Sequence, residues 1–281
     1  MPIRLIVILL LVVGLAYGGY QGYQYYYFAP SKVVARSNEQ FLKLKSVHMD
    51  LELDATMRIN GVADNQKEQK MKFNLGADTN LDPIKYKGHG KMAIPGVGQE
   101  IEFDLIFLSF DEMYMKSALF GNNWLSITDE GDNAQLQQED YIKQSQAFIK
   151  SLNKDSVVKL EDEVVEGQRV SHYRLDISTD KFLEVYKDQK NYEQMKETFK
   201  NATLKTDMWV GKKNENIIKM VVNIGGAQLY DPKQKQSLGY MDAIVTIKYS
   251  NFNQPVTVEK PEGKIYSTEE LQQLLQSQLQ Q

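Results

Sequence analysis

Three histidines are the side chains in this sequence best suited to general acid–base chemistry or metal binding. They are His48, His89 and His172, and no two of them lie at the spacing of a metal-binding pair. His48 and His172 each stand among the polar positions of a predicted strand. We therefore expect exposed strand histidines, with a metal ligand or a catalytic base as the alternative.

Carboxylates that alternate along one predicted strand are the second candidate for acid–base chemistry. Glu100, Glu102 and Asp104 are separated by apolar residues, and paired acids become catalytic when a hydrophobic pocket separates their pKa values. Their parity places them opposite the apolar side of the strand, so we expect solvated surface groups. The sequence also contains no cysteine, no Walker loop, no Gly-x-Ser-x-Gly elbow and no His-Glu-x-x-His motif. These observations predict a protein that is not an enzyme and that needs no metal or cofactor.

The composition is that of a globular domain with a surface of mixed charge. The 281 residues are 42% hydrophobic and 25% charged, which is enough apolar material for a sizeable core. The formal net charge is only -4 and the lysines are scattered, which argues against the clustered basic face of a nucleic-acid-binding protein. No linker rich in proline, glycine or serine divides the chain. We therefore expect one domain over residues 31–281.

Residues 1–30 have the character of a membrane segment. Leu5–Ala16 is an almost unbroken apolar run that follows Arg4, and no further charge occurs before Lys32. The uncharged stretch is long enough for a spanning helix, whose outer end would lie among tyrosines that favour the membrane–water interface. Arg4 predicts a cytoplasmic N-terminus and an extracytoplasmic domain, tethered to the cell membrane by one span. The alternative is a signal peptide that is cleaved after Ala16, which would make the domain a secreted one.

The remainder of the chain is dominated by strands with one polar and one apolar side. Between Val47 and Ile59, seven apolar residues alternate with six polar ones without a break, and only a strand gathers that pattern on one face. One wet face and one covered face favour antiparallel pairing. Helical patterns cover residues 38–45 and 137–152, two stretches between 179 and 200, and a final helix from 267. A hairpin turn is expected at residues 166–168, and the whole predicts an α+β fold.

Methionine is frequent on the apolar side of these strands. Seven of the 11 methionines fall in predicted strands, and the flexible methionine side chain suits a surface that accepts varied shapes. A core with fixed packing would use more β-branched aliphatic residues. Two explanations stay open from this pattern alone, namely gap-filling in an ordinary core and the lining of an apolar cavity.

Three segments resemble the lipoprotein carriers of the LolA/LppX/LprG type. Residues 167–176, GQRVSHYRLD, are similar to the strand that precedes the helical insertion of that family. Residues 204–213, LKTDMWVGKK, with 217–220, IIKM, look like its strand–turn–strand, and residues 245–256, VTIKYSNFNQPV, resemble its closing strand. The likeness spans about Ser31 to Lys264. These motifs are structural, and none is a catalytic signature.

The resemblance implies a curved antiparallel sheet, or half-open barrel, with helices covering its concave face. Such proteins are similar in holding acyl chains of lipids or lipoproteins between the sheet and the helices. The side chains that would line the cavity in this chain are Met49, Leu51, Leu53, Met57, Phe73, Leu75, Phe103, Leu105, Phe107 and Met208.

The resemblance also bears on the location and the partners of the protein. Relatives are often anchored through a lipidated cysteine, which this chain lacks, so an N-terminal transmembrane helix would replace that anchor. We expect a tethered binding protein for a lipid or lipoprotein acyl chain in the bacterial cell envelope, with no nucleic-acid partner. The alternative is a sensor or interaction domain on the same fold, which would read envelope lipids or bind an envelope protein.

Overall fold

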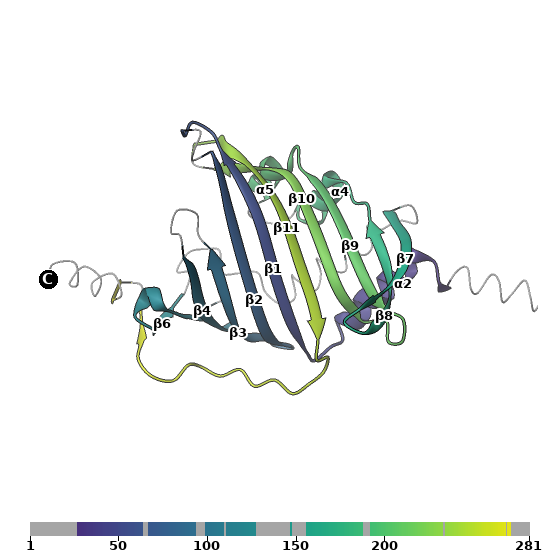
Figure 1. The fold of residues 1–281 in the computed structure, drawn as a ribbon, viewed down its shortest axis with the longest axis horizontal. Helices are drawn as coiled ribbons and strands as arrows, with labels where there is room; N and C mark the ends of the chain where they lie inside the picture. The colour runs from purple at the N-terminus through teal and green to yellow at the C-terminus, as the bar shows by residue number, and fades with distance from the viewer. Residues whose placement is uncertain are drawn as a thin grey trace, which may run out of the picture.

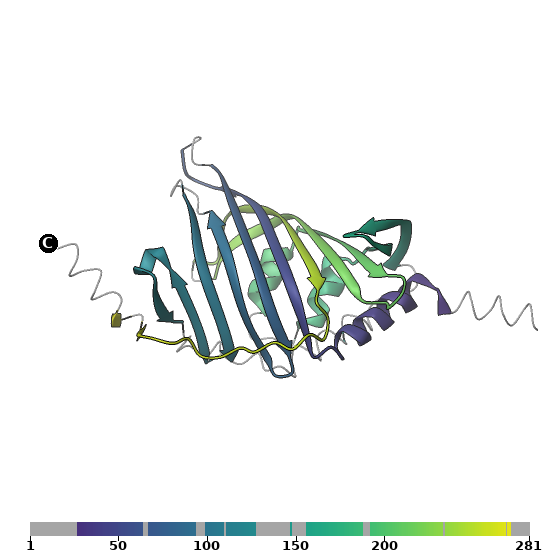
Figure 2. The same ribbon diagram turned by 60° about the horizontal axis from the view of Figure 1, so that its bottom comes forward.

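The computed structural model describes residues 27–63, 67–93, 99–109, 111–127, 147, 156–187, 192–232, 234–267 and 269–270, and most of these residues belong to one large sheet. The sheet has 12 strands in the order β12-β6-β5-β4-β3-β2-β1-β11-β10-β9-β8-β7. Its strands are β1 (Ser46–Ile59), β2 (Glu68–Leu81), β3 (Ile84–Ala93), β4 (Glu100–Ser109), β5 (Glu112–Ser117), β6 (Asn123–Ser126), β7 (Val157–Val165), β8 (Gln168–Leu175), β9 (Thr203–Gly211), β10 (Ile217–Asp231), β11 (Gln236–Ser250) and β12 (Ile265–Tyr266). Neighbouring strands pair antiparallel except β12 with β6. The sheet is curved and open, with β7 at one edge (Figures 1 and 2).

Three short α-helices accompany the sheet in the described part of the chain. They are α2 (Pro30–Phe41), α4 (Thr179–Val185) and α5 (Tyr192–Phe199), and a single 3-10 turn, η2 (Ala118–Phe120), joins β5 to β6. Pro30 begins α2, where its fixed φ suits the first helical turn. The hydroxyl of Ser178 caps α4 by accepting a hydrogen bond from the backbone N–H of Lys181 at 3.3 Å. Figures 1 and 2 show α2 near β7 and β8, and the α4–α5 pair behind β9–β11.

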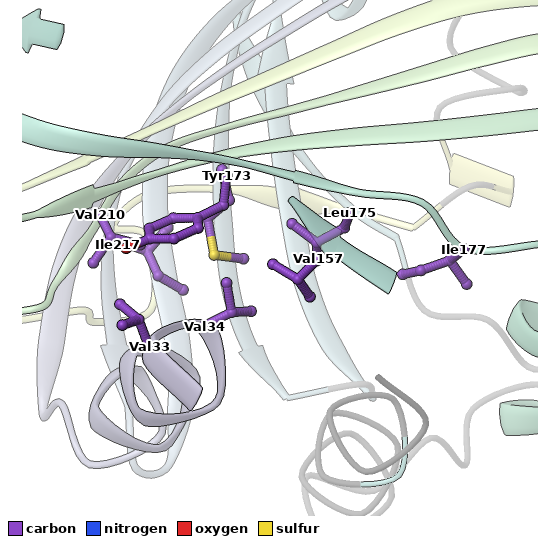
Figure 3. Packing of buried hydrophobic residues seen from close by; sticks show 9 residues of the cluster. Val33, Val34, Val157, Tyr173, Leu175, Ile177, Val210 and Ile217 are labelled. Carbon is purple, nitrogen blue, oxygen red and sulfur yellow. The ribbon is translucent and has the colours of Figure 1, made fainter. Parts of the chain in front are cut away.

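The helices and the sheet enclose the largest buried cluster among the described residues. Its buried members, here called the α2 core, are Val33, Val34, Val157, Tyr173, Leu175, Ile177, Met208, Val210 and Ile217. Figure 3 shows Val33 and Val34 of α2 projecting toward Tyr173 and the other strand residues. Phe182 of α4 packs against the same cluster and contacts Phe199 of α5 at a ring separation of 5.4 Å. All three helices therefore lie on one side of the sheet, which we call the inner face.

A second cluster, here called the β2–β4 core, lies toward the other end of the inner face. Its buried residues are Leu75, Ala77 and Phe103, and Met49, Phe73, Tyr86, Met92, Leu105 and Met115 pack against it. Phe73 and Phe103 stack at 5.4 Å, and Tyr86 stacks on Phe107 at 4.9 Å. Aromatic stacking of this kind adds to the burial of the rings, so the side chains at this end of the inner face pack against one another.

The opposite side of the sheet, the outer face, is largely polar. Ion pairs join neighbouring strands there, including Lys91 with Glu102 at 2.7 Å and Arg58 with Asp242 at 3.0 Å. These groups are exposed, so each pair contributes little to stability. The alternation in the sequence is thus realised as one apolar and one polar face, and the predicted antiparallel α+β sheet with helices on one side is confirmed.

Several helix predictions need correction or fall outside the described chain. The helix expected over residues 38–45 instead begins at Pro30 and ends at Phe41, because proline at the first turn and the buried pair Val33 and Val34 start it earlier. The helix from residue 179 and the one ending near residue 200 are confirmed as α4 and α5. Apart from residue 147, the helix predicted over residues 137–152 lies outside the described residues, as does most of the one predicted from 267. No helix within the described ranges is long and apolar enough to cross a membrane, and residues 1–26 are not among them.

His48 lies on the outer face beside two carboxylates, Asp50 and Asp78. Its Nδ1 lies 2.7 Å from Oδ1 of Asp78, and its Nε2 lies 3.4 Å from Oδ1 of Asp50. Burial alone would lower the pKa of His48, but the hydrogen bond to Asp78 and the charges of Asp50 and Asp78 raise the pKa above 6.5. A raised folded-state pKa stabilises the fold below the unfolded value of 6.5 and loses that contribution as the pH rises through the folded value.

We therefore expect the free energy of unfolding to fall as the pH rises from 6.5, and to fall less in His48→Gln and in Asp78→Asn. The measurement is urea denaturation of the three proteins over a pH series. Equal pH profiles for the wild type and both variants would show that this histidine does not gain a proton on folding.

Candidate functional site

An unbroken row of apolar side chains crosses the inner face of the sheet. Leu51 of β1 lies opposite Leu75 of β2 on one side and opposite Ile247 of β11 on the other. Ile247 lies opposite Met220 of β10, which in turn lies opposite Met208 of β9. Residues that lie directly opposite each other in an antiparallel pair project to the same side. The row therefore runs from the β2–β4 core to the α2 core without a polar side chain.

The ten cavity-lining residues predicted from the sequence all project to this inner face. The register carries Met49, Leu51, Leu53 and Met57 of β1, Phe73 and Leu75 of β2, Phe103, Leu105 and Phe107 of β4, and Met208 of β9 to one side. Their contact with a ligand stays a prediction, because only their common face follows from the register.

Burial and packing separate these ten residues into three groups. Leu75, Phe103, Phe107 and Met208 are buried, and most of them belong to the two cores, so they hold the sheet and the helices together. Met49, Phe73 and Leu105 are partly buried against the β2–β4 core. Leu51, Leu53 and Met57 are half-buried and belong to none of the clusters found among the described residues.

Half-buried apolar side chains continue from β1 onto β11. Val245 and Ile247 lie opposite Leu53 and Leu51, and both are half-buried. We call the set Leu51, Leu53, Met57, Val245 and Ile247 the central stripe. The stripe lies between the α2 core and the β2–β4 core, and its side chains keep solvent exposure that a packed core would remove. This is the arrangement expected of a surface that an apolar ligand completes.

A buried hydroxyl lies at the end of β2 beyond the apolar row. Thr79 is 8% exposed, and its Oγ1 has no hydrogen-bond partner in the described part of the chain. It lies opposite Val47 of β1 and Tyr86 of β3 on the inner face, and burial raises the pKa of Tyr86. An unpaired hydroxyl in such an environment destabilises the fold, because its hydrogen bonds to water are lost without replacement.

Replacing Thr79 by valine should stabilise the ligand-free protein by about 1–2 kcal/mol, because a methyl group takes the place of the unpaired hydroxyl. Urea denaturation of Thr79→Val against the wild type measures the change. Thr246→Val, on the outer face opposite Glu52, is the matched control and should change stability by less than ~0.5 kcal/mol. A loss of stability in Thr79→Val would show that the hydroxyl has a partner.

The surroundings of His172 differ from those predicted from the sequence. Its side chain is only 12% exposed, so the prediction of an exposed strand histidine is wrong here. Nδ1 lies 2.8 Å from Oε1 of Glu163, Nε2 lies 2.9 Å from Oδ1 of Asp207, and the ring stacks on Trp209 at 4.1 Å. Nε1 of Trp209 donates to Oε2 of Glu163 at 3.0 Å. The four side chains join β7, β8 and β9 on the outer face and leave neither ring nitrogen open for a substrate.

The other two histidines are also paired with carboxylates. His48 is half-buried beside Asp78, whereas His89 is exposed and lies 2.9 Å from Asp104. Across the described ranges no group of three or more histidine, aspartate or glutamate side chains could hold a metal ion. The carboxylates Glu100 and Glu102 lie exposed on the outer face, as the sequence predicted, and Glu102 pairs with Lys91.

An open hollow of about 500 Å³ lies on the outer face across β2, β1, β11, β10 and β9. Its lining carries both charges, with Lys72 and Lys205 beside Asp54 and Asp242. A bulge in β10 contributes to its floor, where Gly226 has φ 67° and donates its N–H to Oδ1 of Asp242 at 2.8 Å. The hollow is open and its lining carries charged groups of both signs, so it suits a protein partner more than an acyl chain.

Comparison with known proteins relates both the sequence and the fold to others. Residues 29–264 match a family of unknown function (DUF6612), and no curated protein matches the chain. Among solved structures, the chain is similar to LprF from Mycobacterium bovis with 16% identity and a TM-score of 0.50, covering 83% of this chain and 97% of LprF. It is also similar to the lipoprotein LppX from Mycobacterium tuberculosis with 14% identity and a TM-score of 0.44, covering 82% of this chain and 98% of LppX.

The likeness to LprF concerns the fold, because 16% identity says nothing of individual ligand contacts. It confirms the LolA/LppX/LprG-like fold that the sequence segments predict. The common side of Leu51, Leu53 and Met57 could be predicted from the alternation in β1, whereas Val245 and Ile247 of β11 were not among the predicted lining residues and join the stripe through the pairing of β1 with β11. The unpaired hydroxyl of Thr79 was not, because Thr79 continues the inner-face parity of β2 and only the packing around it reveals the missing partner.

Proposed function

The chain belongs to the family of unknown function DUF6612, and from that membership and the fold we propose that it is a non-enzymatic lipid-binding protein of the bacterial cell envelope. It holds an acyl chain of a lipid or lipoprotein against the central stripe. Residues 1–30 tether it to the cell membrane with the domain on the extracytoplasmic side. It requires no cofactor.

The observation that carries this proposal is the central stripe itself. Leu51, Leu53 and Met57 of β1 are half-buried and lie outside the clusters formed by the described residues. Each methylene group that an acyl chain buries against such a surface contributes about 0.8 kcal/mol. The side chains from Met49 to Met57 span about 26 Å at the rise of a strand. An acyl chain that covers this length buries enough methylene groups to be bound tightly.

The N-terminal segment supports local transfer or retention more than long-range shuttling. Leu5–Ala16 is apolar and the chain carries no charge between Arg4 and Lys32, which suits a membrane segment. A domain held by such a tether stays at its membrane unless the tether is cut. The protein would then receive an acyl chain from a nearby molecule, or pass one to it, at the membrane surface.

A photoactivatable fatty acid tests the proposal in the full-length protein. Membranes that contain the protein would be loaded with a diazirine fatty acid, illuminated and digested with trypsin. Cleavage after Lys45 and Arg58 releases residues 46–58, which contain Met49, Leu51, Leu53 and Met57. We expect label in this peptide as well as in residues 1–30. Label confined to residues 1–30 would contradict acyl-chain binding by the domain.

The hollow on the outer face favours a second function, in which the same fold binds an envelope protein and carries no lipid. Its mixed charges around Lys72, Lys205 and Asp242 suit a polar protein surface. An envelope protein that remains bound to a variant with a blocked central stripe, such as Leu53→Trp, would support this alternative.

A further inference from the structure

We propose that the end of the domain formed by the start of α2, the β7–β8 turn and the β9–β10 turn rests on the lipid surface of the membrane. This inference rests on the proposed tether. To that tether the inference adds a fixed orientation of the domain and a direct contact between the domain and lipid.

A clasp around Arg36 fixes the place where the chain leaves the domain. Its guanidinium makes two bonds to the carboxylate of Glu215, from Nε at 3.0 Å and from Nη2 at 2.7 Å. Nη1 donates to the backbone oxygen of Tyr27 at 2.7 Å, and the guanidinium carbon lies 3.8 Å from the centroid of the Tyr27 ring. Bidentate arginine–carboxylate pairs and cation–π contacts are geometrically specific. Tyr27 is therefore held beside the turn between β9 and β10, where Glu215 lies.

The turn between β7 and β8 lies next to this clasp. The backbone N–H of Lys212 donates to the backbone oxygen of Arg169 at 3.1 Å, and its ammonium pairs with Asp162 of β7. Both turns and Tyr27 thus lie at one end of the sheet. In Figure 1 this is the end where β8 begins and β9 finishes, near α2. The chain has no spacer between this end and the proposed membrane segment.

The side chains at this end suit a membrane–water interface. Phe28 is 53% exposed and Val164 is 68% exposed, the largest value among the exposed large hydrophobic residues that the structure describes. Arg169 and Lys213 are exposed cations nearby. Before Tyr27, the sequence supplies Tyr20, Tyr23, Tyr25 and Tyr26, and tyrosines concentrate where lipid meets water. Because Arg36 holds Tyr27, which directly follows these tyrosines in the sequence, to the domain, the domain has to sit against the lipid with this end.

The opposite end of the sheet should then point away from the membrane. β10 has 15 residues, so its two ends are about 50 Å apart at the rise of a strand. Leu238, near the β10–β11 turn at that far end, is 42% exposed and provides a matched hydrophobic position for comparison.

The absence of cysteine allows a direct test in the full-length protein. Val164→Cys and Leu238→Cys would each be labelled with an environment-sensitive fluorophore and reconstituted in vesicles that contain lipids spin-labelled at the headgroup. We expect the label at position 164 to be quenched several-fold more than the label at position 238. Equal quenching at both positions would overturn the proposed orientation.

Two variants test whether the clasp sets this orientation. Arg36→Gln and Glu215→Gln each remove the ion pair, and we expect the difference in quenching between positions 164 and 238 to shrink in both. An unchanged difference in both variants would overturn the role of the clasp.

Flotation of the vesicles in a density gradient tests the tether separately. Full-length protein that does not float with the vesicles would contradict the tether and the proposed function's location. Flotation with equal quenching would instead leave the tether intact and overturn only the orientation.

Discussion

Leu53→Trp is expected to remove acyl-chain label from residues 46–58 while leaving the label in residues 1–30 unchanged. Leu53 projects from the middle of the central stripe toward the inner face, and it lies opposite Val245 and Phe73. An indole at this position would occupy the space of about three methylene groups, a loss of ~2.4 kcal/mol or roughly 50-fold in affinity. The label in residues 1–30 serves as the internal control, because that segment contacts lipid whether or not the domain does.

Glu52→Trp is the matched control for this substitution. Glu52 is the preceding residue of β1 and is exposed on the outer face, opposite Asn74 and Thr246. It introduces the same indole one residue away and on the other side of the sheet, so labelling of residues 46–58 should stay at the wild-type level. If both variants label equally well, the acyl chain does not lie on the inner face. If both lose the label, the indole disturbs β1 itself, and the claim for the central stripe fails.

Regular alternation made the strands and their two faces predictable before any coordinates. In β1 the pattern runs over the whole strand, and the observed bounds of Ser46–Ile59 differ from the prediction by one residue. In β10 the alternation is interrupted by Gly225 and Gly226, which form a bulge beyond which the strand continues to Asp231. A period of two is a local property of the sequence, so it can be recognised without knowledge of the tertiary fold.

Features that depend on residues far apart in the sequence could not be predicted from it. The Arg36–Glu215 clasp joins residues 179 positions apart, and no local pattern relates them. His172 was misjudged for the same reason, since its stacking on Trp209 follows from the pairing of β8 with β9. The earlier start of α2 at Pro30 was within reach, because proline is favoured in the first turn of a helix.

The sequence also could not separate core residues from lining residues on the inner face. Leu175 and Leu53 both occupy apolar positions of alternating strands, but Leu175 is 1% exposed within the α2 core whereas Leu53 is half-buried outside the clusters of described residues. Alternation reports only the side of the sheet to which a residue projects. The distance from that side to the covering helices decides whether a side chain is packed, and that distance is a property of the tertiary fold.

Two alanine substitutions convert this distinction into a measurement. In the lipid-free protein, Leu175→Ala should lower the free energy of unfolding by about 2–5 kcal/mol, because it leaves a cavity in a packed core. Leu53→Ala should lower it by about 1 kcal/mol or less, because the removed atoms are already in partial contact with water. Urea denaturation of the delipidated wild type and of both variants gives the two values.

The two variants should also differ in how much an added fatty acid stabilises them, and here Leu53→Ala should show the larger defect. A ligand that binds only the folded state stabilises it in proportion to the logarithm of its concentration over its dissociation constant. Leu175→Ala should keep most of the gain in free energy of unfolding that the fatty acid gives the wild type, because Leu175 lies in the α2 core. Leu53→Ala should lose part of this gain. If Leu53→Ala costs as much as Leu175→Ala without lipid, the inner face is packed against the protein's own atoms. The central stripe would then be core, and no surface would remain there for an acyl chain.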